Sequence, residues 1–215
     1  MKLLITAGPT REPIDPVRYL TNRSSGKMGY ALVEAALEAG HEVVLVSGPV
    51  NLTAPKAATT VQVETAVEMY EAVAREIGSC DTAIFCAAVA DYRVDGIEAS
   101  KIKKTEDELI LKLIKNPDIL GSARSEFGFS GVLVGFAAET DDVLAHAQEK
   151  MERKGCDLLV ANDVSRRDIG FDREENEVTL LFRSGESQVL SLASKKRIGR
   201  EILQVVENLR DQRKP

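Results

Sequence analysis

Short apolar or alternating stretches recur along the chain at a spacing that predicts β-strands separated by helices. Runs of strand length occupy residues 3–6, 43–46, 61–63, 83–88, 109–114, 132–136 and 157–161. Between several of them, apolar residues at helical spacing predict helices over 27–39, 65–77, 117–126 and 141–154. Later runs at 178–182 and 188–192 flank a Ser-Gly turn and predict a hairpin. Ser194 is expected to cap a final helix.

This order of elements predicts the fold class. Strands that alternate with helices form βαβ units, so we expect an α/β, Rossmann-like, mostly parallel sheet with helices on both faces and a C-terminal antiparallel hairpin. Since no linker or repeat interrupts the pattern, residues 1–215 are expected to form a single domain. Ligands of such sheets bind beyond the carboxyl ends of the strands. The polar segments expected there are 8–29, 87–93, 101–104, 115–118, 136–140 and 162–170.

Composition and charge narrow the possible partners. The 215 residues include 28 Lys and Arg against 34 Asp and Glu, a net charge of −6, which argues against nucleic acid and anionic membrane surfaces as partners. The longest apolar run, 82–90, is far shorter than the roughly 20 residues of a membrane span. Residues 1–5 lead directly into a strand pattern rather than a signal peptide. Three cysteines without C-x-x-C spacing are expected to be reduced thiols, so we expect a cytoplasmic protein.

The two histidines argue against a His-based zinc site and a Ser-His-Asp triad. The candidate chemistry instead begins in the long polar loop 9–26, because loops of this length are often functional. Ser24, Ser25 and Gly26 precede a helix and could offer backbone N–H groups to phosphate or carboxylate, although they also fit an ordinary N-cap. Arg18 and Asn22, four residues apart, could present a cation and an amide to one anion.

Two later regions add charge at the expected sheet edge. Ala87 and Ala88 would let a ligand approach the backbone, and Asp91 could bind Mg²⁺ or a sugar hydroxyl, or simply be a turn aspartate. The sequence 101–104 carries three lysines, which fits either a solvated face or an anion site. Lys150 and Lys154 also lie one helical turn apart, where they would suit the helix dipole. Two such clusters in an acidic chain are what a nucleoside triphosphate needs.

Six ordered motifs closely resemble the phosphopantothenoylcysteine synthetase (phosphopantothenate–cysteine ligase) family. They are residues 10–29, 87–93, 101–104, 115–118, 135–140 and 161–164. In many bacteria this enzyme is fused behind a flavin-dependent decarboxylase. No such half is present in this sequence, which is therefore expected to be a stand-alone synthetase or an excised domain. The family's usual Asn-His-Ser-Ser-Gly reads Asn-Arg-Ser-Ser-Gly here, so Arg23 replaces the histidine.

The resemblance implies a ligase of coenzyme A biosynthesis. CTP would activate the carboxylate of 4′-phosphopantothenate as an acyl-cytidylate with release of pyrophosphate. The amine of L-cysteine would then form the amide and release CMP, with Mg²⁺ as cofactor. A mixed anhydride supplies the leaving group that a carboxylate lacks, so positioning and charge neutralisation carry the catalysis. The residues themselves leave both CTP and ATP open.

The resemblance also implies roles for individual residues. Asn22 and Lys101 would be catalytic, with Lys101 on a mobile flap, and Arg18, Asn22, Ser24, Ser25 and Gly26 would bind substrate. The nucleotide-binding residues would be Ala87, Ala88, Asp91, Lys101, Pro117, Asp118, Ile119, Leu120, Phe136, Lys150 and Lys154. Asp91 would also be the metal ligand, and without the resemblance Phe136 would be read as a core residue. Loop 9–26 would take part in a homodimer.

Two other functions compete with this one. A Rossmann-like nucleotide-binding oxidoreductase fits the predicted sheet, but the chain has neither G-x-G-x-x-G nor a Tyr-x-x-x-Lys pair after a suitable strand. A non-catalytic scaffold that dimerises through loop 9–26 is the other alternative. The ligase is the leading hypothesis because it accounts for all six motifs and both lysine clusters.

Overall fold

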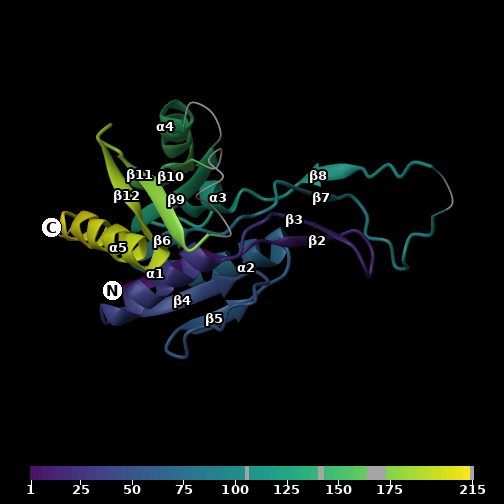
Figure 1. Ribbon diagram of the computed structural model, residues 1–215, viewed down its shortest axis with the longest axis horizontal. Helices are drawn as coiled ribbons and strands as arrows, with labels where there is room; N and C mark the ends of the chain where they lie inside the picture. Colours follow the sequence, from purple (N-terminus) through teal and green to yellow (C-terminus); the bar gives the residue numbers. More distant parts are fainter. Residues whose placement is uncertain (105–106, 140–142, 164–172, 214–215) are drawn as a thin grey trace.

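A twisted eight-stranded sheet forms the centre of the molecule (Figure 1). The computed structural model describes residues 1–104, 107–139, 143–163 and 173–213. Six strands are parallel and pair in the order β5 (Thr59–Gln62), β4 (Glu42–Ser47), β1 (Lys2–Ala7), β6 (Thr82–Phe85), β9 (Val132–Glu139) and β10 (Leu158–Asp163). β11 (Glu175–Phe182) and β12 (Ser187–Ser194) extend the sheet as an antiparallel hairpin beyond β10.

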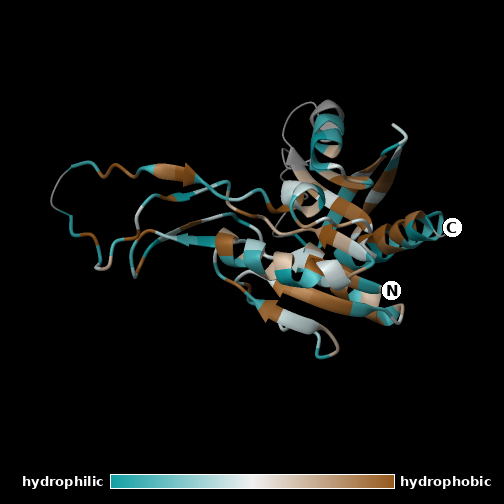
Figure 2. Ribbon diagram, turned by 180° about the vertical axis from the view of Figure 1, so that it is seen from behind, coloured by the Kyte–Doolittle hydropathy of each residue, from teal (hydrophilic) through white to brown (hydrophobic). Residues whose placement is uncertain are grey.

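Helices cover both faces of the sheet. One apolar core joins the sheet to α1 (Lys27–Glu38) and α5 (Lys195–Asp211). The other joins it to α2 (Ala66–Glu76), the 3₁₀ turn η1 (Ile77–Ser79), α3 (Ile119–Ser125) and α4 (Val143–Lys154). The central strands are largely hydrophobic, as expected for strands covered on both sides (Figure 2). The predicted α/β fold with its C-terminal hairpin is confirmed.

Most helix ends agree with the sequence. Thr65 accepts from the Glu68 amide and Glu68 reaches back to the Thr65 amide, a capping box at the start of α2. Ser194 accepts from the Arg197 amide and caps α5, as predicted. The helix predicted to open at Pro117 instead begins at Ile119, because the Asp118 side chain accepts from the Gly121 amide. The predicted caps Asp141 and Asp142 lie outside the described residues.

Helix α1 packs unusually close to β1, and glycine makes this approach possible. A Cβ added at Gly29 would lie 2.5 Å from the Cβ of Ala7. Gly26, the N-cap residue, has φ 79°, a conformation that glycine adopts without strain. The start of α1 is therefore fixed directly above the end of β1.

Two small hairpins form an arm that projects from the sheet (Figure 1). We use "the arm" for residues 11–21, 92–104 and 107–115, which contain the pairs β2 (Arg11–Pro13) with β3 (Tyr19–Thr21) and β7 (Tyr92–Val94) with β8 (Leu113–Lys115). Two expectations are therefore wrong. Loop 9–26 contains a hairpin, and the strand predicted over 109–114 is confined to residues 113–115.

A buried aspartate joins the two halves of the arm. The Asp15 carboxylate accepts from the Arg18 side chain, from the Val17 and Arg18 amides, and from the Ile102 amide at 3.1 Å. Arg18 Nη2 also donates to the Ile102 carbonyl at 3.2 Å. The hydrogen bond from Arg18 is the main reason that the pKa of Asp15 is lowered. Since Ile102 directly follows Lys101, Asp15 anchors the lysine-rich segment to the first hairpin.

Helices long and apolar enough to cross a bilayer are absent from the described part of the chain.

Candidate active site

The strand order of the sheet reverses between β1 and β6. β4 and β5 lie on one side of β1, whereas β6, β9 and β10 lie on the other. In open α/β sheets such a reversal leaves a crevice beyond the carboxyl ends of the strands. The loops 8–26 and 86–91, which follow β1 and β6, border this crevice. They contain most of the residues that the sequence singled out.

Hydrogen bonds hold these two loops together. The Ala88 amide donates to the Gly8 carbonyl at 2.9 Å, and the Thr10 amide donates to the Ala88 carbonyl at 3.3 Å. The Thr10 hydroxyl oxygen accepts from the Ala90 amide at 3.0 Å. Asn22 Nδ2 donates to the Ala88 carbonyl at 2.9 Å. Asn22 is therefore held beside the small-residue segment that follows β6.

Two cavities adjoin along the crevice and share Ala87, Val89, Asp91, Phe136 and Lys150 as lining residues. We call them the first and the second lobe. The first lobe, of about 580 Å³, is also bordered by residues 115–120, Arg153 and Lys154. The second lobe, of about 560 Å³, is also bordered by residues 22–24 and 26–29, and by Cys86, Ala88, Ala137, Asn162, Asn176 and Lys195.

The first lobe combines basic side chains with a helix start. Lys154 pairs with Asp118, and Lys150 Nζ donates to the Phe136 carbonyl at 3.3 Å. Burial alone would raise the pKa of Asp118, but the hydrogen bonds from Lys154 and the Gly121 amide outweigh it and lower that pKa. Both lysines therefore face one cavity, as the spacing on α4 predicts. A polyanion entering the first lobe would meet their ammonium groups.

The second lobe is electropositive and contains the N-terminus of α1. The helix has no side-chain cap hydrogen bond and no acidic residue in its first turn, so its first amides are directed to this end without a competing carboxylate. Among the described lining residues, Arg23, Lys27, Lys150 and Lys195 are cationic and Asp91 is the one carboxylate. This charge balance favours an anionic ligand.

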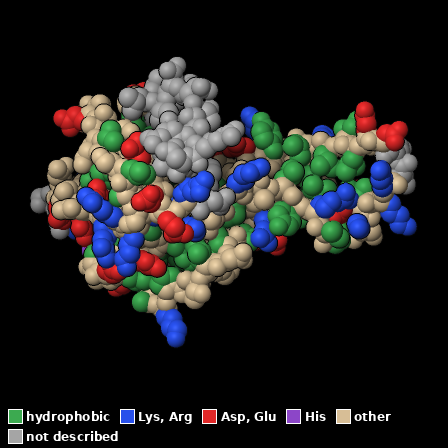
Figure 3. All heavy atoms as spheres, in the orientation of Figure 1, with side chains coloured by type: hydrophobic (Ala, Val, Ile, Leu, Met, Phe, Trp, Pro, Cys, Tyr) green, Lys and Arg blue, Asp and Glu red, His purple; other side chains and the backbone are tan. Residues whose placement is uncertain are grey.

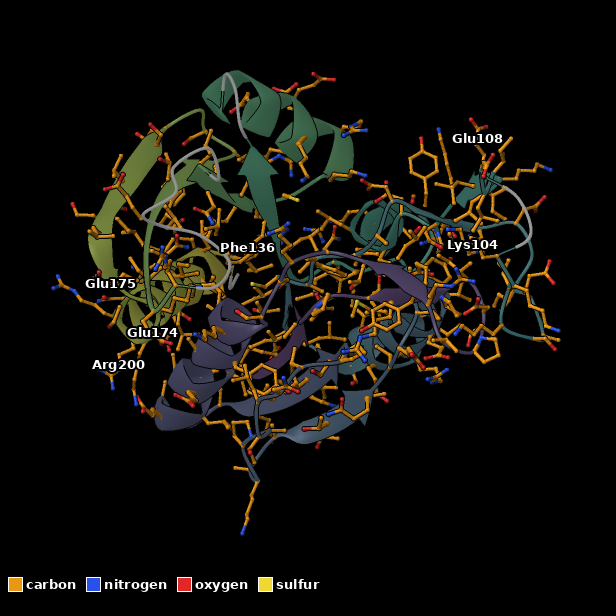
Figure 4. The ribbon with its side chains drawn as sticks, turned by 45° about the vertical axis from the view of Figure 1, so that its right-hand side comes forward. Lys104, Glu108, Phe136, Glu174, Glu175 and Arg200 are labelled. Carbon is orange, nitrogen blue, oxygen red and sulfur yellow. The ribbon has the colours of Figure 1, made fainter. Side chains whose placement is uncertain are left out.

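Arg18 and Lys101 lie elsewhere in the chain, on the arm. With residues 102–104 and 107–110 they line a third cavity of about 860 Å³. Figure 4 shows Lys104 on the arm and Phe136 over the sheet, far from each other in the view. The single chain therefore brings Lys150 and Lys154 together but does not place Lys101 beside them.

The other residues predicted for the site lie along the two lobes, which together we call the groove. Ala87, Asp91, Phe136 and Lys150 border both lobes. Asn22, Ser24, Gly26 and Ala88 border only the second lobe, whereas residues 117–120 and Lys154 border only the first. Ser25 lies between two lining residues without lining either lobe. Phe136 is half-buried and also packs against the α1–α5 core.

Several lining residues were missed by the sequence reasoning. They are Lys27, Asn116, Arg153, Asn162, Asn176 and Lys195. Asn162 belongs to a quoted motif, residues 161–164, that received no role. The strand directions could have indicated Asn176 and Lys195. When a hairpin pairs antiparallel with the last parallel strand, its first strand begins at the carboxyl edge of the parallel strands and its second strand ends there. β11 begins at Glu175 and β12 ends at Ser194, so both residues lie at this edge.

The groove is suited to holding two anionic ligands next to each other. The thiol of Cys86 borders the second lobe, but burial raises its pKa to about 12, so it is a poor nucleophile near neutral pH. The other polar groups there include ammonium groups, the Arg23 guanidinium, amides, backbone N–H groups and the Asp91 carboxylate, which bind and orient charge. Such a site can promote transfer between two bound substrates by alignment and charge neutralisation.

Comparisons with known proteins identify the family. The family model described as "DNA/pantothenate metabolism flavoprotein C-terminal domain" matches residues 1–209. The chain is 50% identical over 209 residues to the coenzyme A biosynthesis bifunctional protein CoaBC of Vibrio vulnificus, covering 96% of the chain and 52% of that protein. It thus spans about half the length of the curated relatives it matches.

Solved structures agree. The crystal structure of the C-terminal domain of a coenzyme A biosynthesis bifunctional protein CoaBC superposes with a TM-score of 0.82 at 43% identity, covering 98% of this chain and 96% of the other. A Cab2 variant in complex with phosphopantothenate-cysteine superposes with a TM-score of 0.82 at 18% identity, covering 98% and 86%, and shows the shared fold. Since the family model covers nearly the whole chain, this protein belongs to the phosphopantothenoylcysteine synthetase family of DNA/pantothenate metabolism flavoprotein C-terminal domains, as the six motifs predicted.

Proposed function

We propose that this chain is a phosphopantothenate–cysteine ligase that uses CTP. The observation that carries the proposal is the two-lobed groove at the strand-order reversal, with basic residues in both lobes and Asn22 held at Ala88. The carboxylate of 4′-phosphopantothenate would attack the α-phosphate of CTP, forming an acyl-cytidylate and releasing pyrophosphate. The amine of L-cysteine would then attack the activated carbonyl, forming the amide and releasing CMP.

The groove supports a division of labour between the lobes. The first lobe offers Lys150, Lys154 and the segment 117–120 to the nucleotide. The second lobe offers Asn22 and the α1 N-terminus to the acid, so that its carboxylate would lie at the boundary with the nucleotide. Attack of one anion on another is slow unless their charges are neutralised, and the shared Lys150 lies where both would meet.

Magnesium fits the groups at this boundary. Mg²⁺ is usually held by one or two carboxylates together with substrate phosphates and water. Asp91 borders both lobes and is the carboxylate we propose as its ligand. When bound with CTP, the ion would neutralise phosphate charge on the leaving pyrophosphate.

A homodimer is part of the proposal. Arg18 and Lys101 lie on the arm, outside both lobes of their own chain. The arm also exposes apolar side chains, of which Ile110 is 87% and Ile97 is 62% exposed, and hydrophobic side chains gather on the arm in Figure 3. Exposed apolar patches of this kind mark association surfaces. Pairing through the arms would cover them and bring Arg18 and Lys101 nearer to a groove.

The test is a reaction that omits one component at a time. We expect pyrophosphate release with 4′-phosphopantothenate, CTP and Mg²⁺, and amide formation only when L-cysteine is added. Initial rates with CTP, ATP, GTP and UTP compare the nucleotides directly. Absence of pyrophosphate with every nucleotide would refute the proposal.

Replacing the arm lysine tests its proposed catalytic role. Lys101→Gln should reduce kcat at least about 100-fold, the size expected when a group that stabilises developing charge is removed. Its thermal midpoint should stay within about 1 °C of the wild type, because Lys101 is exposed. Lys56→Gln, an exposed lysine remote from both lobes, is the matched control. A large loss of stability in Lys101→Gln would instead point to a structural role.

A further inference from the structure

Part of the wall of the second lobe is built by residues from the C-terminal hairpin and helix α5. Asn176, at the start of β11, is 3% exposed, and Lys195, the first residue of α5, is 6% exposed. Both border the second lobe, as do the first residues of α1. None of the six motifs contains either residue. A buried amide oxygen at the wall of a cavity is costly to desolvate unless it accepts a hydrogen bond, which directs attention to Asn176.

Asn176 has a polar atom that is not paired by the described residues. Within the described part of the chain its Oδ1 is buried and accepts no hydrogen bond, and the same holds for Oδ1 of Asn162. Asn162 directly follows Ala161, which pairs with Thr179 of β11, and Asn176 lies three residues before Thr179; both amides border the second lobe. The β11–β12 register shifts between Asn176 and Val178. Such irregularities redirect side chains and occur next to binding sites.

Lys195 adds a cation to the same end of the cavity. Lys195 and Cys86 border the same cavity, and the positive charge of Lys195 opposes the rise that burial causes in the pKa of that thiol. Lys27, across the lobe on α1, pairs with Glu174 at 2.5 Å. Glu174 is 83% exposed and precedes β11, where Figure 4 shows it beside Glu175. An anion in the lobe would therefore compete with Glu174 for Lys27.

We propose that Asn176 and Lys195, together with the N-terminus of α1, form a subsite for a phosphate ester that carries a hydroxyl or N–H donor close to its phosphate. The donor would satisfy the orphaned amide oxygen, and the phosphate would lie against the ammonium group and the helix amides. This inference rests on the proposed function, which supplies two ligands of this chemistry. 4′-Phosphopantothenate has a hydroxyl and an amide N–H near its phosphate, and CTP has ribose hydroxyls.

Steady-state kinetics of the full chain distinguish the two sources. Lys195→Gln should raise KM for one phosphorylated substrate by about tenfold or more, as expected for the loss of a hydrogen bond to a charged group. Asn176→Ala should raise the same KM by about threefold or more, as expected for the loss of a hydrogen bond between neutral groups. KM for the other phosphorylated substrate and for cysteine should change less than about twofold. A rise for 4′-phosphopantothenate assigns the subsite to the acid, and a rise for CTP assigns it to the nucleotide. Unchanged KM for both overturns the inference.

Matched neighbours serve as controls, and one variant should act in the opposite direction. Lys196→Gln and Glu175→Gln replace exposed residues adjacent to the subsite and should leave both KM values unchanged. Glu174→Gln should lower the affected KM by about threefold, because it removes the carboxylate that competes for Lys27. Glu174 is exposed, so this variant remains informative if Lys195→Gln or Asn176→Ala fails to fold. An unchanged KM in Glu174→Gln also counts against the inference.

A binding measurement separates this inference from the proposed function. Calorimetry without cysteine would titrate the wild type and Lys195→Gln with pyrophosphate, 4′-phosphopantothenate and CTP in turn. We expect at least one of these to bind the wild type about tenfold more tightly than the variant. If that difference appears in a protein without ligase activity, the subsite stands and the proposed reaction fails. If the wild type is active and the affinities of the two proteins are equal, the subsite fails and the reaction stands.

Discussion

At the scale of single residues, burial controls the pKa of two thiols, and one of them, Cys86, borders the groove. Burial raises the pKa of both Cys86 and Cys156 to about 12, with the neighbouring Asp157 adding to the rise at Cys156. A thiol with a raised pKa remains protonated until the pH approaches that value. The Cys86 thiol at the groove is thus protonated near neutral pH. This agrees with the proposed reaction, in which the amine of the substrate L-cysteine is the nucleophile.

The raised pKa values of Cys86 and Cys156 can be tested by the rate of alkylation. At pH 8 we expect Cys86 and Cys156 to react with iodoacetamide about a thousandfold more slowly than free cysteine, because only about one thiol in ten thousand is ionised when the pKa is near 12. Mass spectrometry of digested samples over time gives the rate for each site. Adding denaturant is the control and should restore ordinary rates. Rapid labelling of Cys86 in the native protein would show that its pKa is not raised.

The sequence identified those groove residues whose position follows from local features, such as the end of a strand or the spacing along a helix. Asn22, Asp91 and Lys154 follow predicted strands or lie at helical spacing, and the structure places all three at the groove. Asn176 and Lys195 were missed because their position depends on which end of an antiparallel strand meets the parallel ones. Lys101 depends on the arm, whose contacts bridge distant parts of the chain. Its predicted place beside the other lysines remains a prediction.

At the scale of elements, the close contact between α1 and β1 determines where the second lobe begins. Gly29 allows this contact, since any side chain there would meet Ala7. The helix start and the strand end are consequently fixed relative to each other. We expect the position of the α1 amides to depend on this one packing contact.

Gly29→Ala should therefore destabilise the protein by about 1–3 kcal/mol, the usual cost of forcing an extra methyl group into a packed site. For a chain of this length that corresponds to a fall of about 2–4 °C in thermal midpoint for each kcal/mol. Gly78→Ala is the matched control, because a Cβ at Gly78 would meet no atom within 4 Å. Equal midpoints for the two variants, measured by differential scanning fluorimetry, would contradict the close packing.

The buried strands of the sheet could be predicted from the sequence, whereas most of the short strands of the arm could not. β6 and β9 are continuous apolar runs buried on both faces, so the sequence alone identified them. β2, β3 and β7 have three residues each and include polar positions, so no periodicity marks them. Their pairing depends on tertiary contacts such as those of Asp15, which a local pattern cannot contain.

For the whole molecule, the arm determines how chains could associate. Most apolar residues of the body are buried in the two cores, whereas the arm exposes Ile97, Leu109 and Ile110. The acidic net charge of −6 opposes indiscriminate association, so a specific apolar surface is needed to bring two chains together.

Multi-angle light scattering tests this expectation. The wild type should have the mass of a dimer, and Ile110→Asp should raise the dissociation constant at least about tenfold, because it places a charge in an apolar contact. Val189→Asp is the control: Val189 is 61% exposed on β12, in the body of the protein. A monomeric wild type, or equal dissociation of the two variants, would exclude the arm as the dimer surface.

The anchoring of the arm by Asp15 also bears on how the protein acquires its shape. The hydrogen bond from the Ile102 amide to Asp15 joins positions 87 residues apart, and the chain between them includes α1, β4, α2 and β6. Closing so long a loop is entropically costly until the intervening segments have folded. During synthesis the first hairpin emerges from the ribosome long before its partner does. The arm is thus expected to be completed only after the segments between its two halves have folded.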